Sequence, residues 1–406
     1  MTFEMLETES LGTVIKVVGV GGAGGNAVHH MIRKNVQGVE FICANTDAQA
    51  LAKSTAHRVL QLGASGLGAG AKPEAGKAAA EHDRIRIAEA LQGAHMVFIT
   101  AGMGGGTGTG AAPVVAEVAK ELGALTVAVV TKPFSFEGGR RSKSAEAGLA
   151  ELEGKVDSLI VILNEKLEEV LGDDITQMEA FAAADDVLNN AVAGIAEIIN
   201  VEGLVNVDFE DVKTVMGEQG KAMMGTATAS GPDRAEVAAQ QAVRSPLLEG
   251  VDLSGARGIL VNITANQSLK LKETKIAMET IRQFAAEDAT IIFGTVYDEA
   301  MGDEMRVTVV ATGLGAGRRR PSLVPNTATM PLQRTGTYDL VGEAVSTSPV
   351  LPEPSLPAGP SIPATADIPT IWRQPAKGEA AARVMALEEG GMDRLDIPAF
   401  LRKQAD

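Results

Sequence analysis

The chain has 406 residues, of which 45% are hydrophobic but only 3% aromatic, and its formal net charge at pH 7 is −16. This length predicts two folded domains, and the acidic balance argues against nucleic acid or direct membrane insertion, since anionic partners require a basic surface. The one cysteine, Cys43, lies in an apolar run and is interpreted as a buried hydrophobic residue; without a disulfide, a signal segment or a long apolar run, we expect a soluble cytoplasmic protein.

Between residues 13 and 175, apolar runs alternate with helical patterns. Several runs are apolar on both faces, which is typical of central strands in a parallel sheet covered by helices. The expected strands are Thr13–Val20, Val39–Asn45, Arg58–Leu62, His95–Thr100, Leu125–Lys132 and Ser158–Asn164. The expected helices are Asn26–Lys34, Pro73–Leu91, Thr109–Leu122 and Arg140–Glu153. The pattern predicts an α/β domain with a doubly wound, mostly parallel sheet.

A long central helix is expected within residues 176–205, from Thr176 to Asn200, because its apolar residues form one stripe of helical period. Residues 206–316 predict a second, α+β domain with a mixed sheet. Its expected helices are Phe209–Gln219, Arg234–Arg244 and Leu271–Ala285, and its expected strands are Gly258–Thr264, Thr290–Tyr297 and Arg306–Ala311. Because the last two strands are separated by a short segment, we expect them to form an antiparallel hairpin.

The two ends of the chain differ from the domains between them. Residues 1–12 are mostly polar and predict a flexible N-terminus, while the proline-rich composition of residues 317–390 predicts a disordered linker. Residues 391–406 regain an apolar cluster on that tether, which favours a partner-docking peptide over an unstructured tail. The apolar cluster is formed by Leu395, Ile397, Pro398, Phe400 and Leu401.

The most informative segment is the glycine-rich run 100–110, which follows an apolar run directly. Glycine has no side chain to pack, so we expect neither a regular strand nor a regular helix there. Bare backbone N–H groups and threonine hydroxyls before a helix are typical of a phosphate cradle. The run lacks the lysine of a P-loop and does not match a dinucleotide fingerprint.

A second glycine loop, residues 19–26, contains Gly-x-G-x-x-Gly and is followed by Asp47 at the end of the next strand. Alone it fits a dinucleotide site with a ribose-binding acid, or a tight turn without a ligand. In a parallel sheet, however, loops 19–26 and 104–110 open on the same edge, so both helix N-termini can converge on one polyphosphate. Two cradles without a lysine predict a nucleoside triphosphate held mainly by backbone amides.

Gly-Gly-Gly-Thr-Gly-Thr-Gly at 104–110 resembles the signature of the tubulin/FtsZ superfamily of GTPases. The resemblance extends to residues 19–26, 45–47, 132–138, 206–212 and 395–403. It implies that GTP or GDP, with Mg²⁺, is bound by two phosphate loops and a base pocket. The implied phosphate residues are Gly21, Gly22, Ala23, Gly24, Gly25, Asn26, Gly104, Gly105, Gly106, Thr107, Gly108 and Thr109. The implied ribose and base residues are Glu137, Arg141, Asn164, Phe181 and Asp185.

Helix geometry gives independent support to the last pair. Phe181 and Asp185 lie four residues apart, on one face of the expected helix, so a ring can stack on a base while a carboxylate accepts two hydrogen bonds. Guanine presents N1–H and N2–H₂ together and adenine does not, so an acidic acceptor selects guanine. Without the motif context, Asp185 reads equally well as a solvated charge, and the neighbouring Asp186 leaves the choice between the two open.

Asp208 and Asp211 lie three residues apart where a helix is expected to start. From the residues alone, Asp208 is better read as an N-cap and Asp211 as a first-turn acid that complements the helix dipole. The resemblance reverses this reading: it implies that Asn206, Asp208 and Asp211 insert into the nucleotide site of the next subunit and complete it for hydrolysis. Such a head-to-tail contact builds a filament of this chain.

The resemblance also implies a role in bacterial cell division, in a ring at mid-cell beneath the inner membrane, with membrane-tethering and regulatory proteins bound through the C-terminal peptide. Two alternatives remain at this stage. An NAD(P) oxidoreductase explains residues 19–24 but not the second glycine loop or the tail. A nucleotide-binding regulator that does not polymerise is disfavoured by the intact segment 206–212.

Overall fold

The computed structural model describes residues 12–172, 174–200, 205, 207–218, 221–245, 256–286 and 289–314. The expected flexible N-terminus (up to residue 11), the linker 317–390, the docking peptide 391–406 and Asn206 lie outside the described residues. Within these ranges, no helix combines the length and the apolar character needed to cross a membrane.

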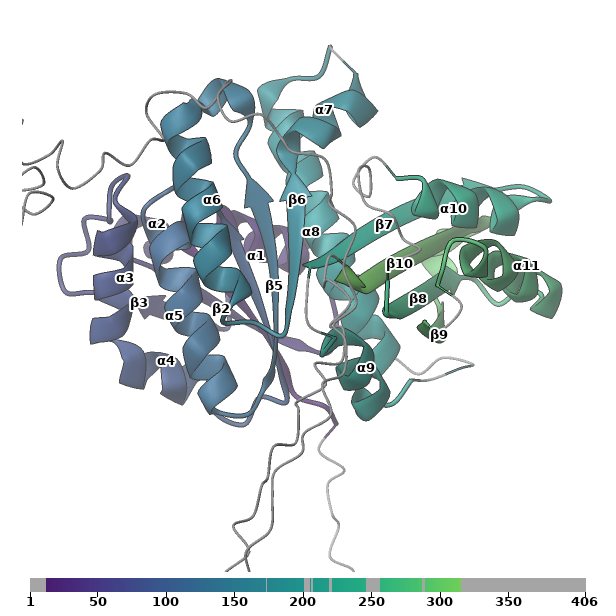
Figure 1. The fold of residues 1–406 in the computed structure, drawn as a ribbon, viewed down its shortest axis with the longest axis horizontal. Coiled ribbons are helices and arrows are strands. Elements are labelled where there is room, and N and C mark those ends of the chain that lie inside the picture. The colour runs from purple at the N-terminus through teal and green to yellow at the C-terminus, as the bar shows by residue number, and fades with distance from the viewer. Residues whose placement is uncertain are drawn as a thin grey trace, which may run out of the picture. The chain divides into compact units, whose positions relative to one another are not determined.

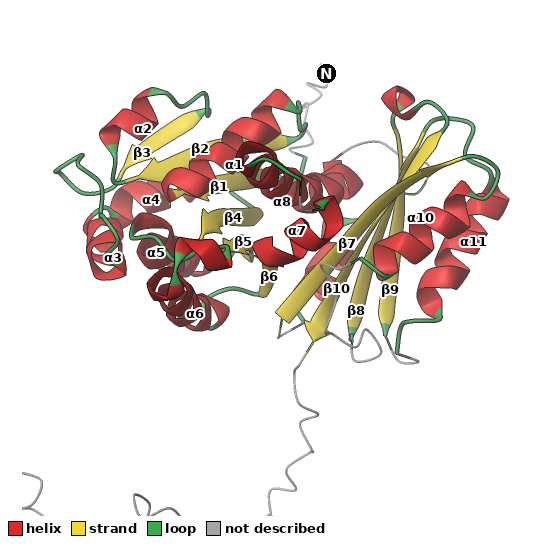
Figure 2. Ribbon diagram, turned by 90° about the horizontal axis from the view of Figure 1, so that it is seen from above, coloured by secondary structure: helices red, strands yellow, loops and turns green. Residues whose placement is uncertain are grey.

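Six parallel strands form the sheet of the first domain, in the order β3-β2-β1-β4-β5-β6 (Figures 1 and 2). They are β1 (Ile15–Val20), β2 (Val39–Asn45), β3 (Arg58–Gln61), β4 (Met96–Gly102), β5 (Leu125–Lys132) and β6 (Ser158–Leu163). The direction of winding reverses between β1 and β4. Ligands bind at such a reversal, beyond the carboxyl ends of the strands.

Helices cover both faces of this sheet, as Figure 2 shows, with α1 (Gly21–Arg33) and α8 (Gln177–Asn200) on one side. The other side carries α3 (Pro73–His82), α4 (Arg84–Leu91), α5 (Thr107–Glu121) and α6 (Gly139–Glu153). Successive strand residues alternate between two cores: Val17 packs with α1 and α8, and Val18 packs with α4 and α5. Cys43 is buried in the first core, as predicted. Shorter elements are α2 (Ala48–Ala52), the 3-10 turn η1 (Ser135–Glu137) and α7 (Asn164–Leu171).

The second domain has a mixed sheet in the order β7-β10-β8-β9, which β7 joins to β6 through two residue pairs. Its strands are β7 (Lys221–Ser230), β8 (Gly258–Ala265), β9 (Thr290–Tyr297) and β10 (Glu304–Leu314). Its helices are α9 (Phe209–Met216), α10 (Arg234–Val243), α11 (Leu271–Arg282) and the 3-10 turn η4 (Glu299–Met301). One sheet face packs on the core that contains α8 and the other on α10 and α11. The predicted α/β and α+β architectures are therefore confirmed.

The predicted hairpin between the last two strands is wrong. β10 pairs antiparallel with β7 and β8, while β9 pairs with β8 in parallel and forms an isolated bridge to Val205 through Thr295. β10 is buried almost throughout, which fits its central position between β7 and β8. The connection from β9 to β10 therefore passes over β8. The sequence analysis also missed β7, whose Met-Met-Gly-Thr-Ala-Thr-Ala stretch has few of the β-branched residues typical of strands.

Two further expectations need correction in the first domain. The helix expected over Pro73–Leu91 is divided at Asp83, whose carboxylate accepts a hydrogen bond from the Gly63 N–H at 2.6 Å and pairs with Arg86. The glycine run is not free of regular structure: β4 continues to Gly102, and α5 begins at Thr107. Close packing replaces side chains here, since a Cβ on Gly110 would collide with the backbone at the start of α3.

Candidate functional site

The two glycine loops meet at the carboxyl edge of the parallel sheet. β1 passes directly into α1 and β4 into α5 through its glycine turn, so both helices begin at this edge. Gly21 has a φ of +75°, and a Cβ at this position would lie 2.9 Å from the backbone nitrogen of Gly108. Only glycine allows the loops to approach this closely. Their helix N-termini therefore face one site, which suits an anionic ligand.

A cavity of about 460 Å³ opens where these loops meet. Twelve of the predicted residues line it: Gly22, Ala23, Asn26, Gly105, Gly106, Thr107, Gly108, Glu137, Arg141, Asn164, Phe181 and Asp185. Gly21, Gly24, Gly25, Gly104 and Thr109 do not; Gly24 packs against the carbonyl of Thr100, and the Gly104 N–H donates to Thr109 Oγ1 at 2.8 Å. These five residues therefore belong to the two loops without lining the cavity wall.

One wall of the cavity comes from a segment that the sequence analysis did not assign. Gly68, Ala69 and Gly70, in the loop between β3 and α3, line the cavity, and Gly70 packs against Gly106, the residue before α5. Thr46, after β2, holds α5 in place through a 2.6 Å hydrogen bond between its Oγ1 and that of Thr107. The sequence signal for this wall was the group of glycines before Pro73, at 63, 66, 68 and 70. In the structure, all four have positive φ.

The far end of the cavity is suited to a planar base. The Phe181 ring meets Phe134 edge to face, with centroids 5.4 Å apart. Asn164, at the start of α7, is 4% exposed, and its Oδ1 has no hydrogen-bond partner among the described residues. A buried unpaired acceptor is rare and marks a place for a ligand or water. Between the two ends, Glu137 forms an ion pair with Arg141, the one basic residue among the described residues that line the cavity.

The neighbouring acids of α8 occupy different environments. Asp185 lines the cavity, and burial raises its pKa to about 6 despite the opposing attraction of His30 and Arg33. Asp186 turns to α1, where its Oδ1 lies 2.8 Å from His30 Nε2 and 3.4 Å from Lys34 Nζ. The geometry thus favours Asp185 over Asp186 as the acceptor for a base.

The predicted catalytic acids lie at the opposite edge of the sheet. Asp208 caps α9, and its Oδ1 accepts a hydrogen bond from the Asp211 N–H at 2.8 Å, as the N-cap reading predicts. The ring of Phe209 contacts His95, the residue before β4, with centroids 6.1 Å apart. His95 marks the amino end of β4, whereas the glycine loop follows its carboxyl end about 20 Å away at the usual strand rise. Figure 1 shows α9 and α7 at opposite ends of α8. These acids therefore do not reach the cavity of their own chain.

The fold and the site define a class of α/β nucleotide-binding proteins in which glycine loops, without a P-loop lysine, border the cavity. Residues 14–172 match the Tubulin/FtsZ family GTPase domain, and residues 220–315 match the FtsZ family C-terminal domain. The chain therefore belongs to the FtsZ family and is a GTPase. This confirms the predicted resemblance and enzyme class, and it does not favour the oxidoreductase alternative.

Relatives and solved structures agree with this assignment. The chain is 54% identical over 415 residues to the cell division protein FtsZ of Pseudomonas aeruginosa, with both chains fully covered. It is 52% identical to that of Coxiella burnetii, with 99% of each chain covered. An empty FtsZ dimer from M. jannaschii superposes with a TM-score of 0.73 at 43% identity, covering 77% of this chain and 90% of that one. CetZ2 from Haloferax volcanii, at 21% identity and a TM-score of 0.64, shares the fold; 76% of this chain and 95% of that one are covered.

Proposed function

We propose that this chain is a cell-division GTPase that forms head-to-tail filaments and hydrolyses GTP at the junctions between its subunits. The observation that carries the proposal is the separation of the nucleotide cavity from Asp208 and Asp211 at the opposite edge of the same sheet. A subunit stacked on the next brings these two edges together. The dimeric FtsZ of M. jannaschii supports self-assembly.

GTP binds with its phosphates along the two glycine loops and its guanine at the α7–α8 end. Backbone N–H groups at the starts of α1 and α5 hold the phosphates; each charge-assisted hydrogen bond contributes about 1.5–3 kcal/mol. Asp185 accepts N1–H and N2–H of guanine, Phe181 stacks on the ring, and Asn164 supplies the unpaired acceptor. Glu137 and Arg141, already paired, border the ribose.

Hydrolysis requires groups that this cavity lacks. Its acids are Asp47, which caps α2, Glu137, which pairs with Arg141, and Asp185 at the base end. Asp208 and Asp211 of the stacked subunit orient and deprotonate the attacking water, and Asn206 lies in the same segment. General-base assistance of this kind contributes about 10²–10⁴-fold. Because the site is complete only in the filament, turnover depends on assembly.

Mg²⁺ accompanies the nucleotide in this proposal. Within the described ranges, no three His, Cys, Asp or Glu side chains gather as a preformed cage. That fits Mg²⁺, which is usually held by phosphate oxygens, water and one or two carboxylates. When bound, it neutralises charge on the phosphates.

In the cell, we place the filament in the division ring at mid-cell beneath the inner membrane, since the relatives are named cell division proteins. Capture at the membrane falls to the C-terminal peptide, with Leu395, Ile397, Pro398, Phe400 and Leu401 as its apolar face and membrane-tethered division proteins as its partners. An acidic chain of net charge −16 has little affinity of its own for anionic lipid.

The test has two measurements. The first is the GTPase rate per molecule as a function of protein concentration. The second is light scattering of the protein with GTP, with GDP and with NADH. The proposal predicts a rate per molecule that rises cooperatively with concentration, together with scattering in GTP only. A rate per molecule that stays constant down to the dilute limit would contradict it. Scattering without GTP dependence would contradict the nucleotide-driven joint.

A further inference from the structure

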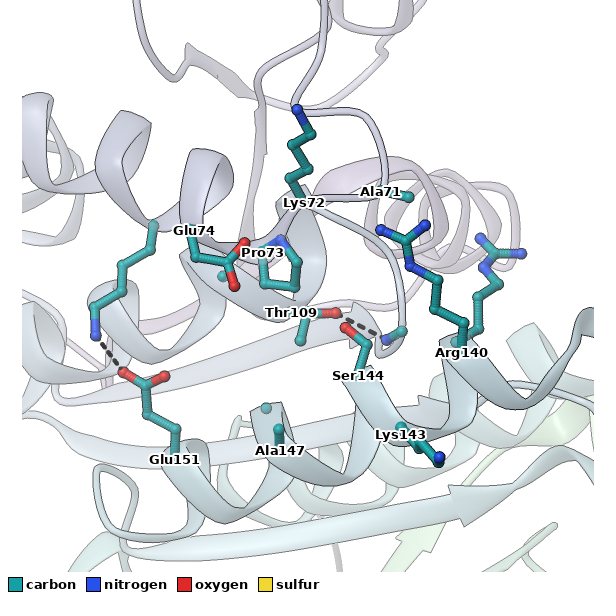
Figure 3. A pocket seen from close by; sticks show the side chains of 15 residues that line it. Ala71, Lys72, Pro73, Glu74, Thr109, Arg140, Lys143, Ser144, Ala147 and Glu151 are labelled. Carbon is teal, nitrogen blue, oxygen red and sulfur yellow. Dashed lines mark hydrogen bonds and ion pairs between the residues drawn. The ribbon is translucent and has the colours of Figure 1, made fainter. Parts of the chain in front are cut away.

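A second cavity, of about 540 Å³, lies behind the glycine loop, between the start of α3 and one face of α6 (Figure 3). Its lining includes small residues of α5 and α6: Thr109, Gly110, Ala147 and Gly148. Arg141 lines both cavities, so the two are neighbours. Apart from Arg141, the residues of this second cavity that the proposed function involves are Gly104 and Thr109, in the glycine loop.

The cavity is basic in a chain of strongly acidic balance. Five basic and two acidic side chains line it: Lys72, Lys77, Arg140, Arg141 and Lys143, with Glu74 and Glu151. Two of the cations are already engaged. Lys77 Nζ lies 2.6 Å from Glu151 Oε1, and Arg141 is paired with Glu137.

Among the described residues, Lys72, Arg140 and Lys143 have no ion-pair partner. Figure 3 shows Lys72 extending from the start of α3 and Arg140 from the start of α6, at the end of the cavity opposite Glu151. Lys72 is also the residue before Pro73, the first residue of α3, and no side chain caps that helix end. Unpaired cations beside an uncapped helix start attract a compact anion.

We infer that this cavity is a second anion site, which takes a small oligophosphate between Lys72 and Arg140. The volume falls within the range of about 300–1,000 Å³ that is usual for small-ligand pockets. Two cations from different helices fit an anion with several separated charges better than a single carboxylate. Glu74, in the first turn of α3, and Glu151 on α6 oppose binding of long or uniformly anionic polymers.

The test is calorimetric titration of inorganic tripolyphosphate into full-length protein saturated with GDP, which occupies the first cavity. We expect one tripolyphosphate per chain. Lys72→Ala and Arg140→Ala should each weaken binding, and the double variant should weaken it by at least about 10-fold, as loss of charge-assisted contacts requires. Neither residue lines the nucleotide cavity, so the GDP affinity of the variants should stay unchanged.

Lys272→Ala with Arg282→Ala is the matched control, because it removes the same two charges from exposed positions on α11. It should bind tripolyphosphate like the unmodified chain. The inference is overturned if the unmodified chain does not bind tripolyphosphate at millimolar concentration. It is equally overturned if the Lys72/Arg140 double variant, folded by thermal melt, binds as tightly as the control.

Discussion

The carboxyl and amino edges of the β1–β6 sheet use different chemistry. At the carboxyl edge, glycine turns expose backbone N–H groups at the starts of α1 and α5, and side chains matter mainly at the base end. At the amino edge, α9 presents the carboxylates of Asp208 and Asp211. In the proposed function, the carboxyl edge is the binding edge and the amino edge is the reacting edge. Affinity and turnover should therefore respond to different mutations.

The largest separation is expected for Asp211→Ala. Removing this carboxylate should lower the GTPase rate by about 10²–10⁴-fold, the usual contribution of a general base. GTP affinity, measured by equilibrium titration, should stay unchanged because Asp211 does not line the cavity. Glu210→Ala is the control, since Glu210 is an exposed neighbour that pairs only with Lys213 among the described residues. A matching loss in Glu210→Ala would assign the effect to charge at α9 in general.

At the other edge, Asp185→Ala should weaken GDP binding by roughly 10- to 150-fold, the equivalent of one charged hydrogen bond of about 1.5–3 kcal/mol. Asp186→Asn should weaken it far less, because Asp186 contacts His30 and Lys34 on α1 instead of the cavity. Fluorescence titration with a labelled GDP measures both. Equal losses in the two variants would contradict the assignment of Asp185 to the base.

The glycines of the binding edge differ in what they do for the fold. Gly24→Ala should lower the free energy of unfolding by about 1–3 kcal/mol, because the new Cβ has to displace the carbonyl of Thr100. Gly25→Ala is the matched control on the same helix, where a Cβ meets nothing within 4 Å. It should leave stability unchanged or raise it slightly. Urea unfolding without nucleotide compares the two, and equal losses would show that helix-start geometry, not packing, sets the requirement.

The smallest effect concerns pH. Burial raises the pKa of Asp185 in the nucleotide-free protein to about 6, and only the ionised carboxylate has both oxygens free to accept from N1–H and N2–H of guanine. GDP affinity should therefore fall as pH drops below about 6, by up to tenfold per unit. Phosphate groups of GDP also titrate near pH 6. The pH dependence of GDP affinity in Asp185→Asn therefore measures the phosphate contribution alone. An identical pH profile in Asp185→Asn would show that Asp185 does not determine the pH dependence.

Sequence patterns predicted most of the fold because it rests on strong local signals. Apolar runs such as Val39–Asn45 and the glycine loop after β4 identified the parallel sheet and its binding edge. β7 was missed because its own residues have little strand propensity, and its strand conformation depends on pairing with β10. The position of β9 beside β8 was missed because a short connection between two strands does not require them to be neighbours in the sheet.

The site divided in the same way. Motifs located Gly22, Phe181 and Asp185, but the wall formed by residues 68–70 depends on a loop that folds back over α5. Local sequence also assigned Asp208 to a helix cap, and the structure has that cap. The local sequence pattern around Asp208 is the same whether its carboxylate only caps α9 or also acts on the nucleotide of the next chain. Only the distance between the two edges separates these roles.

The most direct test of the shared site is complementation between two variants with opposite defects. Asp211→Ala keeps the binding edge and loses the reacting edge, whereas Asp185→Ala does the reverse, so each alone should hydrolyse GTP slowly. Mixed in equal amounts, they should regain activity at about one junction in four, where the intact edges of two different subunits meet. If both groups acted within one chain, the mixture would show only the average of the two low rates, and the account of a site completed by assembly would be wrong.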